Sequence, residues 1–111
     1  MASSLEFVQY VADQLALAGT ITFRKMFGEY GLFCDGKFFA TVEDNGLYLK
    51  ITPAGHELLP QGIIASPHEG AHFFFIENLE DREFLAHLVR STCAQLPEKK
   101  PRKKKETSTR L

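Results

Sequence analysis

Cysteine is scarce in this sequence of 111 residues: Cys34 and Cys93 are the only two, and they do not form a CxxC motif. The N-terminus also lacks the basic segment and following apolar run of an export signal. We therefore expect a cytoplasmic protein that folds without disulfides and keeps both thiols free. Long apolar runs are missing as well, residues 73–76 being typical of the short ones present, so we expect no membrane-spanning segment and no membrane partner.

The formal net charge is only −1, but the charge is unevenly distributed along the chain. Seven basic and two acidic residues follow Leu96, which gives residues 97–111 a charge of +5, whereas six basic residues face twelve acidic ones in residues 1–96, a charge of −6. The tail has two prolines and no aromatic residue, so it cannot bury enough apolar surface to offset the entropy of ordering it. We expect one domain over residues 1–96 and a disordered basic tail over residues 97–111.

The tail is a candidate for non-specific nucleic-acid binding, because each phosphate that a basic side chain neutralises releases a counterion. Such binding would weaken steeply with salt, and without aromatic residues the tail offers no stacking platform for single strands. A solubilising tail with no specific role is the alternative. The candidate contact residues are Lys99, Lys100, Arg102, Lys103, Lys104 and Lys105.

Three segments carry helix signals. Ser3 and Glu6 have the spacing of a capping box, and apolar residues recur every three or four positions from there to about Ala18. Thr52 followed by Pro53 predicts the start of a short second helix that ends by Gly62. A third helix begins after Asn78 or Asp81, with an apolar stripe that extends to Leu96.

Between these helices the apolar period changes to two, which is typical of strands. An Asp35-Gly36 pair predicts a tight hairpin, residues 44–46 predict a slightly longer turn, and Gly28 indicates either a break or a bulge. Strands flanked by helices without βαβ alternation favour an α+β fold, a two-layer antiparallel sheet of about four or five strands with helices packed on one face. The predicted strands are residues 20–27, 30–34, 37–43, 47–51 and 71–77.

Residues 24–33 combine two glycines with several large apolar or aromatic side chains, and residues 38–42 and 47–50 follow as further strand segments. This pattern resembles the N-terminal domain of the TfoX/Sxy family of bacterial competence regulators, across residues 3–96 and most strongly across residues 24–50. The resemblance implies a two-layer α+β domain. It also implies a regulatory role, since longer members promote competence-gene transcription with the cyclic-AMP receptor protein and carry a second, helical domain, where this sequence has its basic tail.

We expect a non-enzymatic module that acts through protein–protein contacts, with the transcription machinery or a second copy of the chain as candidate partners. Ten phenylalanines are many for one small core, and those on the uncovered sheet face would form a partner or homodimer surface. A solvated strand edge is the alternative for the basic residues before Met26. The candidate partner-binding residues are Arg24, Lys25, Met26, Phe27, Gly28, Tyr30, Gly31 and Tyr48.

Residues 68–72 match the HExxH pattern of zinc hydrolases letter for letter. That pattern requires a helix, which places both imidazoles one turn apart on the same face. Here Pro67 precedes it, Gly70 lies inside it and a strand-like run follows, so a hairpin loop is favoured over a zinc hydrolase at His68 and His72. We expect no catalytic residue, no metal and no cofactor.

Overall fold

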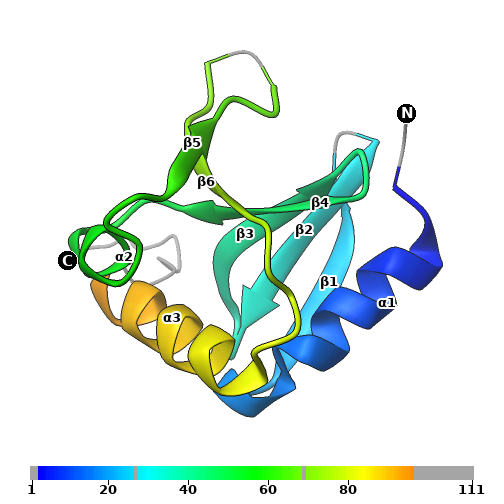
Figure 1. Cartoon of the computed structure of the whole chain (residues 1–111). Helices are drawn as coiled ribbons and strands as arrows, with labels where there is room; N and C mark the ends of the chain where they lie inside the picture. Colours follow the sequence, from blue (N-terminus) through cyan, green and yellow to red (C-terminus); the bar gives the residue numbers. More distant parts are fainter. Residues whose placement is uncertain (1–2, 27, 69, 97–111) are drawn as a thin grey trace, which may run out of the picture.

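The computed structural model describes residues 3–26, 28–68 and 70–96, so the predictions for Phe27 and residues 97–111 concern positions outside the described part of the chain (Figure 1). The elements follow the order α1 (Leu5–Gln14), a 3-10 turn η1 (Ala16–Ala18), β1 (Ile21–Met26), β2 (Glu29–Cys34), β3 (Lys37–Glu43), β4 (Gly46–Lys50), α2 (Pro53–Leu58), β5 (Ile63–Ala65), β6 (Phe73–Ile76) and α3 (Arg82–Gln95). Within the described residues no helix is both long and apolar enough to cross a bilayer.

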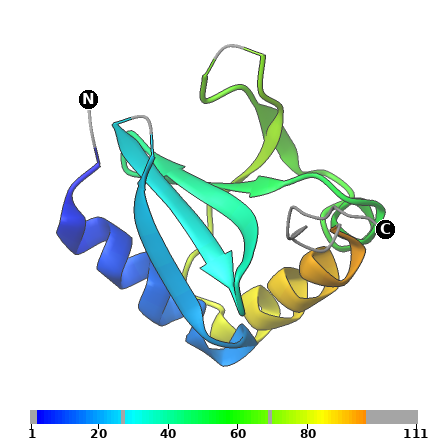
Figure 2. The same ribbon diagram turned by 180° about the vertical axis from the view of Figure 1, so that it is seen from behind.

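All six strands form one antiparallel sheet in the order β1-β2-β3-β4-β6-β5. The helices lie on one side of this sheet, and the loop that joins β5 to β6 rises on the other side (Figures 1 and 2). The predicted α+β class, with helices on one face, is confirmed, although the sheet has one or two strands more than expected.

The strand that the sequence did not reveal is β5. Its three residues pair with β6, with Ile63 opposite Phe75 and Ala65 opposite Phe73. Three residues are too few to show an alternating pattern, so this strand is defined by its partner and not by its own sequence.

Three tight turns set the register of β1 to β4. Asp35 and Gly36 have φ angles of 51° and 87°, as the two central residues of a type I′ hairpin require. Asp44 and Asn45 likewise have φ angles of 51° and 57°, and Gly46 pairs with Glu43, so this turn has two residues and not the three that we predicted. Asp and Asn tolerate the left-handed region because their short polar side chains can hydrogen-bond locally.

The predicted irregularity at Gly28 is a turn between separate strands, since Met26 pairs with Glu29 across it. The bulge lies in β3 instead, where Phe33 pairs with Phe38 and Leu32 with Ala40. The extra residue, Phe39, is fully buried. Consecutive residues of a regular strand point to opposite faces, and the bulge interrupts this alternation, so that Phe39 and Ala40 are both fully buried although they are neighbours in sequence.

The core lies between the sheet and the helix layer. α1 and α3 present apolar stripes to the sheet, as their spacing predicted, and the fully buried side chains come from every layer. The largest of them are Phe39, Phe74, Leu15, Leu32, Leu47, Leu49, Leu85, Leu88, Val8, Val11, Val42 and Val89.

The start of α1 differs from the prediction by one residue. Ser4, not Ser3, is the N-cap, and its hydroxyl accepts from the backbone N–H of Phe7 at 3.1 Å. Ser3 is held elsewhere, because its N–H donates to Glu29 and its hydroxyl accepts from the N–H of Asn45. The predicted caps of α2 and α3 hold, with Thr52 accepting from Gly55 and Asp81 from Phe84.

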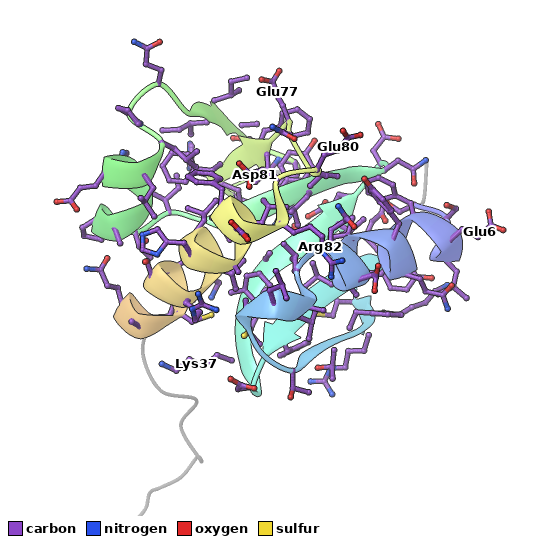
Figure 3. All side chains as sticks on the ribbon, turned by 60° about the horizontal axis from the view of Figure 1, so that its bottom comes forward. Glu6, Lys37, Glu77, Glu80, Asp81 and Arg82 are labelled. Carbon is purple, nitrogen blue, oxygen red and sulfur yellow. The ribbon has the colours of Figure 1, made fainter. Side chains whose placement is uncertain are left out.

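Polar side chains join the helices to one another and to the sheet. Arg82 of α3 donates to the carbonyl of Asp13 in α1 at 2.9 Å, and Figure 3 shows its side chain beside α1. Lys37 of β3 donates to the carbonyl of Cys93 at 2.9 Å, near the end of α3. A cation at a helix C-terminus satisfies carbonyls that have no partner within the helix.

Candidate functional site

The sheet face turned away from α1 and α3, which we call the open face, carries a continuous group of aromatic and charged side chains. Along each strand the residues of the open face alternate with residues that point towards the helices and the core. Most of them are half-buried by one another and none is covered by a helix. The open face consists of Arg24, Met26, Gly31, Phe33, Phe38, Thr41, Glu43, Tyr48, Lys50, Phe73 and Phe75.

The aromatic rings of the open face pack in cross-strand pairs. Phe33 and Phe38 have ring centroids 5.5 Å apart, and Tyr48 and Phe75 have centroids 5.3 Å apart. Both pairs are tilted, a favourable arrangement for aromatic side chains. The rings therefore form a firm apolar surface that spans the sheet from β2 to β6.

Two cations lie on these rings. The guanidinium carbon of Arg24 is 5.1 Å from the centroid of Phe33, and the ammonium of Lys50 is 4.5 Å from that of Phe38. Burial lowers the pKa of Lys50. Both positions fit cation–π contacts, which keep the long side chains along the apolar surface.

A cavity of about 440 Å³ opens at one end of the open face, under the loop that joins β5 to β6. His68 of that loop hydrogen-bonds through Nδ1 to Glu43 Oε2 at 2.8 Å, which holds the loop over the sheet. Thr41 is 8% exposed, and its hydroxyl has no hydrogen-bond partner among the described residues. The cavity is lined by Met26, Glu29, Tyr30, Phe38, Thr41, Glu43, His68 and Phe73.

Glu29 ties the edge of this region to the N-terminus of the chain. Its carboxylate accepts from the N–H of Ser3 at 2.9 Å and from the N–H of Asp44 at 2.8 Å. Burial acts to raise the pKa of Glu29, but the backbone hydrogen bonds from Asp44 and Ser3 outweigh it, so the pKa lies below its ordinary value.

A Glu29→Gln substitution is expected to lower the free energy of unfolding by about 1 kcal/mol at neutral pH, because one of the two acceptors is lost. The folded-state pKa is lowered, so the carboxylate's contribution is present above the ordinary glutamate pKa and is lost as the pH falls through the folded value. Urea unfolding in neutral and acidic buffer measures this difference, which should shrink in acid. Glu77→Gln, at an exposed glutamate, is the control, and a loss for Glu29→Gln that persists in acid would contradict the explanation.

The predicted partner-binding residues divide between the two faces. Arg24, Met26, Gly31 and Tyr48 belong to the open face, and a Cβ on Gly31 would collide with the side chain of Met26, so Gly31 provides the space in which Met26 lies.

The other predicted residues lie elsewhere. Lys25 and Tyr30 are on the helix side, where the Lys25 ammonium is 5.9 Å from the Tyr30 ring and Tyr30 is buried in the core. Gly28 is in the β1–β2 turn with a φ of 81°.

Several open-face residues were not singled out from the sequence. Phe33, Phe38, Phe73 and Phe75 occur in strands that were expected, and their alternation with buried neighbours could have placed them on one face. The sequence could not predict that His68 lies beside Thr41 and Glu43. His68 is 25 residues from Glu43 in the chain, and strand alternation gives no information on contacts between distant segments.

The described residues of the HExxH segment, His68 and residues 70–72, lie between the paired strands β5 and β6, as predicted, and not in a helix. His68 pairs with Glu43 instead of facing a second histidine across a helical turn. Within the ranges that the structure describes, no group of three or more His, Cys, Asp or Glu side chains could hold a metal ion.

A second cavity, of about 550 Å³, contains both cysteines. Burial raises the pKa of the Cys93 thiol to about 11, with the neighbouring Cys34 thiol adding to the shift, and burial also raises the pKa of Cys34. At neutral pH both sulfurs are therefore protonated and weakly nucleophilic. The remaining walls are formed by Ala18, Asp35, Gly36, Lys37 and Arg90.

A comparison with protein families agrees with the resemblance seen in the sequence, and a second comparison finds a relative that covers nearly the whole chain. The family model described as the TfoX N-terminal domain matches residues 13–96. An uncharacterized 12.7 kDa protein in the trpE 5′ region of Spirochaeta aurantia is 35% identical over 107 residues, which cover 95% of this chain and 93% of that protein. The match includes α2, α3 and all six strands of the sheet. This chain belongs to the TfoX N-terminal domain family.

Proposed function

We propose that this protein is a non-enzymatic module that binds a protein partner through its open face and acts in the regulation of transcription. The single observation that supports the proposal most is the contrast between the two faces of the sheet. One face is covered by helices, and the other carries aromatic rings that no helix of the described residues covers. Aromatic side chains that keep some exposure and pack firmly are the usual anchors of protein interfaces.

The chemistry of the two cavities favours binding over catalysis. Both thiols have raised pKa values, so neither is an activated nucleophile. Glu43 and His68 are joined on an open sheet face with aromatic walls, a setting that suits recognition of a partner group.

The test uses the purified full-length chain, with its mass in solution measured alone and its retained proteins identified after affinity capture. A defined homodimer or a reproducibly retained protein is the expected result. A strictly monomeric protein that retains nothing would contradict the proposal.

The basic tail supports a second candidate function, non-specific contact with nucleic acid. Its charge of +5 against −6 for residues 1–96 is the observation that favours it. Replacing the six candidate basic residues between Lys99 and Lys105 with glutamine should abolish retention of duplex DNA at low salt, because it removes the phosphate contacts. A binding assay against the wild-type chain measures the change, and unchanged retention would exclude the tail as the contact.

A further inference from the structure

We propose that the cavity under the β5–β6 loop receives an arginine side chain from the partner polypeptide. The inference rests on the proposed function of the open face and specifies the group that the partner presents there. It follows from three features of the cavity: an unpaired hydroxyl, the charge of its lining and the aromatic walls.

The unpaired hydroxyl is that of Thr41. The residue is more than nine-tenths buried, lines the cavity and has no hydrogen-bond partner within the described part of the chain. A buried polar atom without a partner costs free energy. The oxygen is itself closed to solvent, so a turn of the Thr41 side chain about χ1 towards the cavity would let a ligand group pair with it.

The charge of the lining selects the ligand. Among the described residues, Glu29 and Glu43 are the acidic residues of the lining, and no described lysine or arginine lines it. Of the two open-face cations, Arg24 lies on the ring of Phe33, outside the lining, and Lys50 lies on the ring of Phe38, which is itself a cavity wall. Glu43 accepts from His68 through Oε2, and within residues 3–26, 28–68 and 70–96 no hydrogen bond is formed by its other carboxylate oxygen, which can accept from a ligand. An organic cation therefore complements this site.

The aromatic walls favour arginine among organic cations. Phe38 and Phe73 lie on the cavity lining, and because Lys50 already lies on Phe38, Phe73 is the ring on which the guanidinium is placed. A planar guanidinium can stack on such a ring while it donates several hydrogen bonds. One guanidinium could thus donate to Glu43 and Thr41 together. The rings of Phe33, Tyr48 and Phe75 continue outside the cavity, which favours a polypeptide that extends along the sheet over an isolated small molecule.

The test is a titration of the isotope-labelled full-length chain with N-acetyl-arginine amide, monitored by backbone amide shifts. N-acetyl-citrulline amide, which has nearly the same shape without the charge, is the control ligand. We expect saturable shifts at Thr41, Glu43 and Phe73 with the arginine probe, and about tenfold weaker binding or none with the citrulline probe. Absence of shifts with the arginine probe, or equal shifts with both, would overturn the inference.

Two variants separate binding from folding. Glu43→Gln should weaken the arginine probe about tenfold, since a charged hydrogen bond is lost. Thr41→Val should also weaken it, yet leave the melting temperature unchanged or raised, because the hydroxyl has no partner among the residues that the structure describes. Thr92→Val, at a second fully buried and unpaired hydroxyl on α3, should leave binding intact. Equal binding by wild type and both cavity variants would count against the site.

A wrong arginine assignment can be distinguished from a wrong assignment of the open face as the docking surface. If the arginine probe does not bind but substitutions on the open face abolish partner retention, the open face is the docking surface and the arginine assignment is wrong. If neither effect is observed, both proposals fall.

Discussion

Replacing Phe74 with alanine is expected to lower the free energy of unfolding by about 3–5 kcal/mol, because the substitution leaves a cavity at the centre of the fold. Phe74 lies on β6 and is 1% exposed. Its ring meets His56 of α2 edge-on at 5.1 Å, and Gly55 and Gly62 pass so close that a Cβ on either would press on it. The residue therefore joins the sheet to α2 and to the segment that leads into β5.

The adjacent Phe75 provides the matched control, since it has the same side chain but points to the open face and is only half-buried. Phe75→Ala should cost about 1–2 kcal/mol, clearly less than Phe74→Ala. Chemical denaturation of both variants measures the difference. Equal losses would mean that the two faces of the sheet are not assigned correctly.

Replacing Tyr48 with alanine is expected to weaken partner binding by about thirtyfold or more, the effect of removing an interface hot spot of about 2 kcal/mol. Tyr48 is at the centre of the open face, on β4, and its ring packs on Phe75 at 5.3 Å. Truncation removes both the ring and the support that it gives to its neighbour. The measurement is affinity capture with wild-type and variant chains, followed by titration of the retained protein.

Tyr10→Ala is the matched control for this experiment. Tyr10 is also a tyrosine, 42% exposed, but it belongs to α1 in the helix layer. We expect its loss to leave partner binding unchanged. If Tyr10→Ala loses the partner and Tyr48→Ala does not, the partner binds the helix layer and not the open face.

The sequence alone predicted the features of the fold that depend on neighbouring residues. Thr52 and Pro53 start α2, and Asp35 with Gly36 forms the tight hairpin, because caps and turns are determined within a few positions. The missed features depend on distant partners. β5 exists through its pairing with β6, and Ser4 rather than Ser3 caps α1 because Ser3 is bound by Glu29 and Asn45.

The sequence predicted the candidate site only in part, because the site also depends on residues that are distant in the chain. The glycines and aromatic residues between Arg24 and Gly31 predicted a partner-binding site in this segment. Half of the predicted positions lie on the open face. Alternation within a strand cannot show which face the helices cover, so Lys25 and Tyr30 were grouped with residues on the opposite side. The cavity brings together β1, β2, β3, β6 and the β5–β6 loop, a combination that only the folded chain displays.

Site-specific photo-crosslinking tests the docking surface most directly. Benzoylphenylalanine is introduced in place of Phe75 on the open face, or of Tyr10 in the helix layer, and each chain is irradiated with its partner bound. Adducts from position 75 and none from position 10 are the predicted result. Adducts from position 10 alone, or in equal yield from both positions, would contradict it.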